Sequence, residues 1–241
     1  PIVRTLYEAV PSPSSFCLEG SQTQALNATY TQVAPSNKLW VINGNNPAGQ
    51  LLGFVGAEIA ATGTPAPRVA AQAPAGRALA FDKEGNLWSI GATTADSPLA
   101  RYAATTLGAS GKKTPDREID LQGTGCLPGL TALAFDPSGA LWATSACSDQ
   151  VIRLTPSSLE LSGKVNPQAD DIATGTKAPQ SVAFDKAGNM WVAGEASIHL
   201  YEAARLAPGQ THTPSLAIEA RTASDGDLAP GALAFDKDGN L

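Results

Sequence analysis

Acidic side chains recur in this chain at positions where short apolar segments give way to polar loops. Carboxylates of this kind could converge into an oxygen-rich site, and they are Asp96, Asp149, Glu195, Asp225 and Asp227. Carboxylate and carbonyl oxygens are the ligands that Ca²⁺ and Mg²⁺ prefer. We therefore take Asp149, Glu195, Asp225 and Asp227 as candidate metal ligands, with Ca²⁺ or Mg²⁺ as the candidate ion. A chain with a net charge of −6 also has acidic loops without any bound metal.

Other polar residues lie in loops that, like those of the acidic residues, border short apolar segments, and these residues are candidates for contact with a ligand. Together with three of the carboxylates, the candidate ligand-binding residues are Asn43, Asn45, Arg77, Asp96, Asp149, Gln180 and Glu195. Ligands of ring-shaped repeat proteins commonly bind where such loops meet, around the central channel. None of these residues forms a recognisable catalytic signature, so the catalytic residues are unknown at this stage.

A second set of aspartates has a different predicted role. Each of these residues follows an apolar run and precedes a Gly that ends a short turn, and they are Asp82, Asp136, Asp185 and Asp236. An Asp at the start of a hairpin turn can accept backbone N–H groups of that turn. We therefore expect a structural role, on the face opposite to the candidate site.

The positions of the histidines and cysteines exclude two kinds of catalytic site and predict one disulfide. His199 lies in a predicted strand and His212 in an outer loop, so neither is placed for a zinc site or a Ser-His-Asp triad. Cys126 and Cys147 flank the two strands of one predicted hairpin, and we expect a disulfide between them, which would indicate an oxidising compartment. Cys17 remains without an assigned partner.

The elements that position these residues come from a repeat. The segments Ala78–Trp88, Ala132–Trp142, Ser181–Trp191 and Ala232–Leu241 share an Ala-Phe-Asp core, and Thr31–Trp40 is a weaker copy. The tryptophans recur at intervals of about 50 residues, a period typical of β-propellers. Each unit contains two apolar strands joined by an Asp-x-x-Gly hairpin, a third strand, a polar loop with at most one helical turn, and an outer fourth strand. We expect the tryptophans to pack between blades.

The predicted fold is therefore all-β, a propeller of four-stranded blades with five blades or a truncated six-bladed ring. We expect one domain over residues 1–241, with repeats at about 26–75, 76–125, 128–176 and 177–227. Residues 228–241 begin a last blade. Two interpretations stay open: residues 1–25 complete that blade, since Leu6–Ala9 matches Leu200–Ala203, or the ring is cut short.

Composition excludes some functions. Only 16 basic residues are present against 22 acidic ones, which argues against a nucleic-acid partner. No apolar run approaches the roughly 18 residues of a transmembrane helix. The first residue is Pro1 and the chain is rich in small residues, so we expect a processed, exported bacterial protein, extracellular or periplasmic.

The Ala-Phe-Asp-x-x-Gly-Asn-Leu-Trp unit resembles the repeats of NHL-like and gluconolactonase-like propellers over residues 30–241. This resemblance implies the propeller fold, which hosts hydrolases, lyases and binding modules alike. It also implies that a gluconolactonase-like site would use Glu, Asn and Asp around a divalent ion, for which Glu195, Asn43 and Asp149 supply the residue types. The histidines on which the lyase members of such propellers rely are not matched.

These observations favour an exported propeller that binds a small molecule or a protein through its channel face, rather than an enzyme. One alternative is a divalent-metal-dependent hydrolase or lyase of the gluconolactonase-like type, with an Asp as general base. A further alternative is a structural part of a surface assembly. No cofactor is required by any motif, and Ca²⁺ or Mg²⁺ is the one that the loops could hold.

Overall fold

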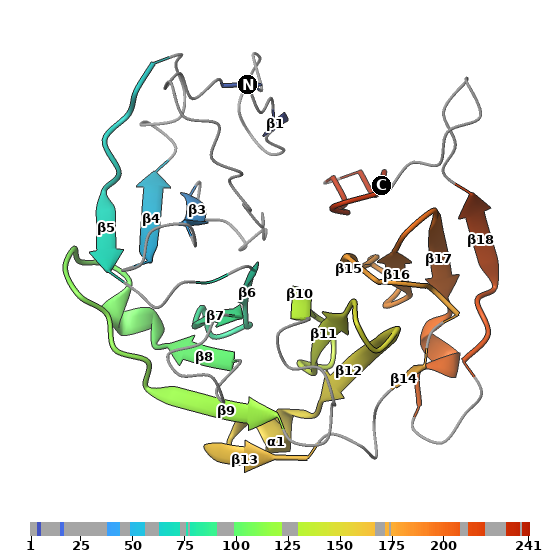
Figure 1. Ribbon diagram of the computed structural model, residues 1–241. Helices are drawn as coiled ribbons and strands as arrows, with labels where there is room; N and C mark the ends of the chain where they lie inside the picture. Colours follow the sequence, from blue (N-terminus) through green and yellow to red (C-terminus); the bar gives the residue numbers. More distant parts are fainter. Residues whose placement is uncertain are drawn as a thin grey trace.

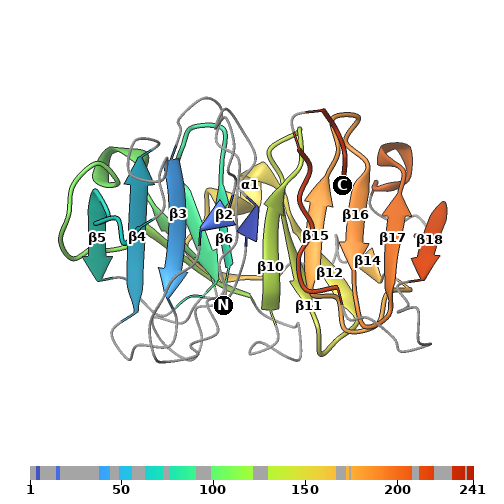
Figure 2. The same ribbon diagram turned by 90° about the horizontal axis from the view of Figure 1, so that it is seen from above.

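The computed structural model describes residues 4–5, 15–16, 38–43, 49–55, 63–72, 76, 78–90, 99–121, 130–166, 172–173, 175–207, 212–219, 230–236 and 238–241. These residues form almost entirely β-structure, arranged as separate sheets that follow one another in an arc (Figure 1). Seen from above, strands of neighbouring sheets run side by side around the arc (Figure 2). The fold is a β-propeller, as the repeat predicts.

Each sheet is one blade, built mainly from strands that are consecutive in the chain. The first blade contains β3 (Lys38–Asn43), β4 (Gln50–Val55) and β5 (Val69–Gln72). The second contains β6 (Ala78–Phe81), β7 (Leu87–Ile90), β8 (Leu99–Tyr102) and β9 (Arg117–Leu121). The third contains β10 (Leu130–Phe135), β11 (Leu141–Ser145), β12 (Gln150–Leu154) and β14 (Ile172–Ala173). The fourth contains β15 (Ser181–Phe184), β16 (Met190–Ala193), β17 (Ser197–Tyr201) and β18 (Leu216–Glu219). Near the amino terminus, β1 (Arg4–Thr5) pairs with β2 (Ser15–Phe16).

The first two strands of the second blade are apolar at nearly every position because both of their faces are covered. All four residues of β7 are buried, and so are three of the four residues of β6. Side chains of one face pack toward the first blade and those of the other toward the third, as two separate clusters of buried residues show. Strands buried on both faces read as continuous apolar runs rather than alternating ones.

Aromatic pairs join each blade to the next. The Trp of one hairpin lies against the Phe of the following blade, with ring centroids 6.0 Å apart for Trp40 and Phe81 and 6.3 Å apart for Trp88 and Phe135. The next contact, between Trp142 and Phe184, has a centroid separation of 5.6 Å. The predicted position of the tryptophans between blades is therefore confirmed for these pairs.

The repeated aspartates have the structural role that the sequence predicts. Asp82 Oδ1 accepts hydrogen bonds from the backbone N–H of Glu84 and of Asn86, at 3.1 and 2.8 Å. Its other oxygen accepts from Asn86 Nδ2 at 2.9 Å and from Trp88 Nε1 at 3.0 Å. Asp136 and Asp185 accept equivalent bonds in their own hairpins. These carboxylates accept hydrogen bonds within their own hairpins, so they do not form a ring of free acids.

In the second, third and fourth blades the polar loop after the third strand contains a single helical turn, as expected: η1 (Ala104–Thr106), α1 (Pro156–Leu159) and η3 (Ala203–Arg205). Pro156 at the first turn and the Thr155 hydroxyl, which accepts from the Ser158 N–H, account for the start of α1.

The segment that follows the helical turn makes a contact that the sequence analysis did not predict. After α1, β13 (Gly163–Val165) pairs in parallel with β9 of the preceding blade, which gives the second blade a fifth strand. Residues 111–113 bind the outer strand of the first blade similarly, since Gly111 N and Lys113 N donate to Ala70 O and Gln72 O of β5. We call these two segments latches. They cover sheet edges that would otherwise present unpaired backbone groups.

The last repeat copy packs on the fourth blade. The ring of Phe235 contacts Trp191 with a centroid separation of 6.0 Å, and Leu233 N donates to Ser181 Oγ at 2.9 Å. Asp236 accepts from the backbone N–H groups of Asp238 and Asn240, as its counterparts do in the other hairpins.

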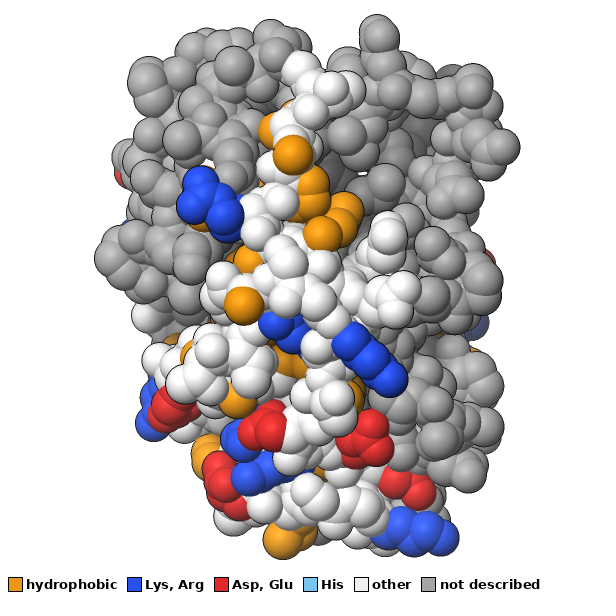
Figure 3. All heavy atoms as spheres, turned by 90° about the vertical axis from the view of Figure 1, so that its left-hand side faces the viewer, with side chains coloured by type: hydrophobic (Ala, Val, Ile, Leu, Met, Phe, Trp, Pro, Cys, Tyr) orange, Lys and Arg blue, Asp and Glu red, His pale blue; other side chains and the backbone are white. Residues whose placement is uncertain are grey.

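Charges of both signs lie together on the outer surface. On the side of the molecule shown in Figure 3, basic and acidic side chains are interspersed over the outer strands. Two ion pairs involve arginines of β8 and β9, Arg101–Asp116 at 2.6 Å and Arg117–Glu160 at 2.9 Å. The second pair ties β9 to the α1 end of the next blade, where Arg117 also donates to Leu159 O.

Replacing Trp88 tests the packing between the second and third blades. Because the Trp88 side chain is 1% exposed, Trp88→Ala should lower the free energy of unfolding by about 3–5 kcal/mol in chemical denaturation. Trp88→Phe keeps an aromatic ring against Phe135 but loses the bond to Asp82, so its loss should be smaller, about 1–3 kcal/mol. Equal stability of Trp88→Ala and the parent would contradict the interblade role.

Acid should weaken the fourth blade through Asp185. Burial raises the pKa of this carboxyl, but hydrogen bonds from Asn189, Trp191 and Ala187 outweigh burial and leave the pKa below its ordinary value of 3.8. The stabilisation is therefore fully present above the unfolded pKa and is lost as the pH falls through the folded pKa. Unfolding followed between pH 6 and pH 2 should show a smaller loss of stability in Asp185→Asn than in the parent. Identical pH dependence in the two proteins would rule this contribution out.

Candidate functional site

The strand register places two kinds of loop at opposite ends of each blade. The Asp hairpins join the first and second strands, where Phe81 pairs with Leu87, and the far end of the same pair is Ala78 with Ile90. At that far end the second strand turns into the third, and the preceding loop leads into the first strand. We call this end the loop face. The best-described part of the loop face is the junction of the third and fourth blades.

A short segment that leads into β15 is held from both sides at this junction. From the fourth blade, Glu195 N donates to Lys177 O at 2.9 Å and Gln180 N donates to Ala193 O at 2.7 Å. From the third blade, Asp149 Oδ1 accepts from Ala178 N at 2.7 Å. We call residues 177–180 the junction segment. Each of its ends is thereby fixed by backbone contacts to the blade that it enters.

Thr131, at the start of the inner strand β10, holds the same segment from the third blade. Its hydroxyl donates to Pro179 O at 2.8 Å and lies 2.8 Å from the hydroxyl of Thr144. Thr144 is fully buried, and its oxygen accepts from Ala132 N at 2.9 Å. This chain of bonds fixes the depth at which the junction segment sits between the blades.

Two residues at the junction adopt a backbone conformation that is costly for side chains other than glycine. The φ angle is 55° at Asp149 and 43° at Ala178. Asp tolerates the left-handed region through local hydrogen bonds, whereas Ala pays about 1–2 kcal/mol for it. Pro179 follows Ala178, and a following proline further restricts a residue toward extended conformations. The two left-handed residues are bonded to each other, so the junction holds a strained arrangement that its contacts keep in place.

A buried polar group lies behind the junction segment. Thr176 has no exposed surface, and its hydroxyl lies 2.7 Å from His199 Nδ1 and 3.3 Å from the Tyr201 hydroxyl. Burial lowers the pKa of His199 below its ordinary value of 6.5, which favours the neutral imidazole at pH 7. His199 is therefore in a strand, as predicted, but it also supports the loop that precedes the junction segment. Sequence reasoning missed this role because Thr176 lies in a loop and His199 lies in a strand 23 residues further along the chain.

The predicted candidates fall into three groups. Asp149, Gln180 and Glu195 lie at this junction, and each makes a hydrogen bond to Lys177 or Ala178. Asn43 ends β3, and its backbone pairs with Gln50. The remaining candidates lie outside the described residues: Asn45, Arg77, Asp96, Asp225 and Asp227. Within the described part of the chain, no three His, Cys, Asp or Glu side chains are grouped so that they could hold a metal ion.

Cys147 lies in the turn between β11 and β12, beside the candidate site. It is disulfide-bonded, and its sulfur is 3.8 Å from Ser145 Oγ. The two other cysteines, Cys17 and Cys126, lie outside the described residues, so the pairing of Cys126 with Cys147 stays a prediction.

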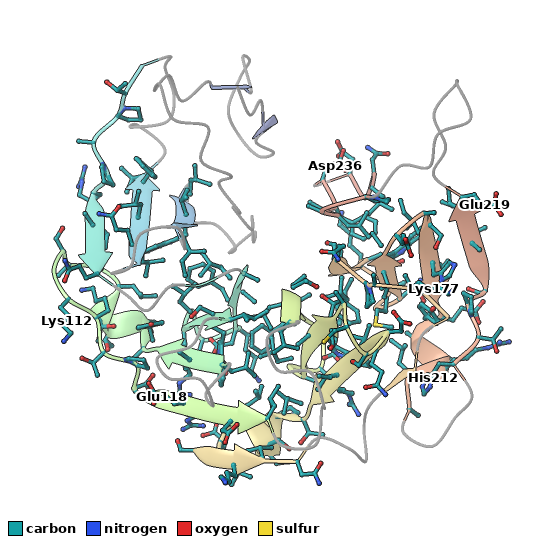
Figure 4. All side chains as sticks on the ribbon, in the orientation of Figure 1. Lys112, Glu118, Lys177, His212, Glu219 and Asp236 are labelled. Atoms are coloured by element: carbon teal, nitrogen blue, oxygen red, sulfur yellow. The ribbon has the colours of Figure 1, made fainter. Side chains whose placement is uncertain are left out.

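The junction offers polar side chains on a fixed support. Lys177 and Glu195 are exposed, and Gln180 is half-buried, with its Nε2 donating to Ala178 O at 3.3 Å. Figure 4 labels Lys177 at the fourth blade. An ammonium group, a carboxylate and an amide on a rigid backbone can provide donors and acceptors of both charges to a bound molecule.

Comparison of the structure with solved structures places it among propellers. The periplasmic gluconolactonase of Pseudomonas aeruginosa matches with a TM-score of 0.57 at 15% identity, over 88% of this chain and 63% of that one. Hydrazine synthase of Kuenenia stuttgartiensis matches with a TM-score of 0.51 at 14% identity, over 83% of this chain and 52% of that one. Virginiamycin B lyase of Staphylococcus aureus matches with a TM-score of 0.48 at 14% identity, over 82% and 57%.

The chain therefore spans between about half and two thirds of the length of these proteins. At such low identity the likeness establishes the β-propeller fold and not the activity. No family model and no curated protein sequence matches the chain. Among the described residues, no helix is both long and apolar enough to cross a bilayer.

Gly194 provides a test of how tightly the junction is packed. A Cβ at this position would lie 2.3 Å from Lys177 O and 2.4 Å from Thr176 Cγ2. Gly194→Ala should therefore displace the junction segment and lower the free energy of unfolding by about 1–3 kcal/mol. Gly175→Ala, in the loop that leads to the junction segment, is a control, because a Cβ there has no neighbour within 4 Å. The control should leave stability unchanged or raise it by up to about 1 kcal/mol, and equal effects of the two substitutions would contradict the close packing.

Proposed function

We propose that this chain is an exported β-propeller that binds a small polar molecule through its loop face, at the junction of the third and fourth blades. The observation that supports this most directly is the junction segment itself. Its backbone is fixed by bonds from both blades, while the side chains of Lys177 and Glu195 remain exposed. A preformed support with exposed polar groups lowers the ordering cost of binding.

The chemistry of the exposed groups indicates the class of ligand. Lys177 forms no ion pair with the described residues, so its ammonium group is available to an anionic group of a ligand. Glu195 and Gln180 can accept and donate hydrogen bonds to hydroxyl groups. A hydroxylated acid, such as an aldonic acid, combines the two features. Protein partners of similar surface chemistry are the other class that the loop face could take.

Binding without catalysis is favoured by how the described polar groups are already used. Thr176 is fully buried against His199, and the hydroxyl of Thr131 is bonded to Pro179 O and Thr144. Neither is free to act as a nucleophile on a molecule at the surface. Asp149 spends one carboxylate oxygen on Ala178 N.

A second function, that of a divalent-metal-dependent hydrolase or lyase, is favoured by the fold similarity to a periplasmic gluconolactonase. In this alternative Glu195, Asp149 and Asn43 would hold Ca²⁺ or Mg²⁺, and the ion would polarise a lactone or similar ester. Asn45, Arg77, Asp96, Asp225 and Asp227 are proposed to line the same face. Export to an oxidising compartment, with a disulfide between Cys126 and Cys147, belongs to both proposals.

The proposal can be tested with a panel of aldonic acids and aldonolactones, screened by thermal unfolding and titrated by calorimetry. A ligand at about 100 times its Kd should stabilise the protein by about 2.7 kcal/mol. Lys177→Ala should weaken binding at least tenfold, because it removes the charge that faces the anionic group. Lys83→Ala is the matched control, since Lys83 is an exposed lysine on a hairpin at the opposite face.

The outcomes separate the two functions. Binding that depends on Lys177 without turnover supports the binding module. Consumption of an aldonolactone that requires Ca²⁺ or Mg²⁺, with about one ion per chain by elemental mass spectrometry after dialysis, would instead establish the enzyme. Binding that is equal in the parent and Lys177→Ala would place the site elsewhere.

A further inference from the structure

One hydrogen bond at the junction is made by a residue whose backbone is in the unfavourable left-handed conformation. The Ala178 N–H donates to Asp149 Oδ1 at 2.7 Å, and Ala178 has a φ of 43° directly before a proline. The two residues are 29 positions apart and belong to different blades. Gln180 Nε2 donates to the carbonyl oxygen of Ala178 at 3.3 Å, and the Asp149 bond is the described contact to its backbone N–H.

Loss of the acceptor oxygen would remove the hydrogen bond to Ala178 N and would also allow the strained backbone of Ala178 to relax. Without an oxygen at Asp149, the Ala178 N–H would have to find water, and the backbone would lose the one described bond to this N–H that opposes relaxation toward an extended conformation. Such a relaxation rotates the peptide that links Lys177 to Ala178. The direction in which the Lys177 side chain leaves the loop would change with it.

The turn that carries Asp149 is itself braced. Asp149 is left-handed at the end of the four-residue turn between β11 and β12, and in that turn Ser148 Oγ donates to Ser145 Oγ at 2.7 Å. Ser145 is fully buried and pairs with Gln150 across the strands. The side chain that carries the acceptor thus extends from a turn that is held to the strands by hydrogen bonds.

We infer that Asp149 is a positioning residue of the loop-face site: its carboxylate oxygen keeps Ala178 left-handed and thereby fixes Lys177 in the orientation that meets the ligand. This inference rests on the proposed binding function. It differs from the metal hypothesis for the same residue, because the required property is a hydrogen-bond acceptor and not a negative charge.

The distinction between acceptor and charge defines the variants. Asp149→Asn keeps an oxygen in place of Oδ1 and loses the charge, whereas Asp149→Ala loses both. Ala178→Gly removes the cost of the left-handed conformation, since glycine adopts positive φ freely. The double variant Asp149→Ala/Ala178→Gly tests whether the acceptor is needed because Ala178 is strained.

Amide hydrogen exchange of Ala178 by NMR measures the clamp without any ligand. Exchange should become about tenfold faster in Asp149→Ala and stay within about threefold of the parent in Asp149→Asn, because only the first variant lacks an acceptor. Affinity for the aldonate that binds the parent should fall about tenfold in Asp149→Ala, and Ala178→Gly should recover part of that loss. Recovery by glycine is not expected of a residue that contacts the ligand directly.

Each alternative result decides against a definite part of the inference. Unchanged exchange of Ala178 in Asp149→Ala overturns the clamp, whether or not a ligand has been found. Faster exchange with unchanged affinity overturns the role in binding. If Asp149→Asn is as damaging as Asp149→Ala, the charge is what matters, and the metal hypothesis replaces the positioning one. Failure of the parent to bind any aldonate would count against the proposed function, while the exchange result would still stand for the clamp.

Discussion

The arrangement of the blades depends on a hydrogen bond between an indole and a hairpin carboxylate. Trp88, Trp142 and Trp191 each donate Nε1 to the Asp that opens their own hairpin, at 3.0, 2.9 and 3.4 Å. The same carboxylate gathers the backbone N–H groups of the turn, so the turn and the ring are oriented together. Each indole then lies against a Phe of the following blade. A local turn motif therefore sets the relation between sheets that are distant in sequence.

This constraint extends to the opposite end of the blades. Trp142 and Phe184 fix the spacing of the third and fourth blades on the hairpin side, and a shared cluster of buried residues fills the space between the two sheets. On the loop face, Asp149 and Thr131 of the third blade therefore meet Ala178 and Pro179 at hydrogen-bonding distance. These hydrogen bonds, which the packing brings within reach, keep Ala178 in its left-handed conformation. The candidate site is thus a product of packing between blades rather than of any single repeat.

The parts of this structure that repeat could be predicted from the sequence. The blades, the turn role of Asp82 and its counterparts, and the buried tryptophans could be predicted, because each depends on residues close together in the chain. The latches were missed, although Ser110-Gly111-Lys112 and Ser162-Gly163-Lys164 are a shared signal for them. Placing Asp149, Gln180 and Glu195 on one face was possible from loop positions alone. That Asp149 bonds to Ala178, rather than facing an ion, depends on the spacing between two blades, which no local pattern encodes.

The latches also put the structural unit out of step with the repeat in the sequence. The stretch that completes the edge of one sheet is encoded by the next repeat, so that β13 finishes a sheet whose other strands end at Leu121. If a repeat were moved from one propeller to another, its latch would pair with the outer strand of an unrelated preceding blade. Its own outer strand would then be covered by the latch of an unrelated following repeat. Grafting of blades should therefore succeed when the boundaries are drawn after the latch and not at the tryptophan. Natural recombination among such proteins would meet the same boundary condition.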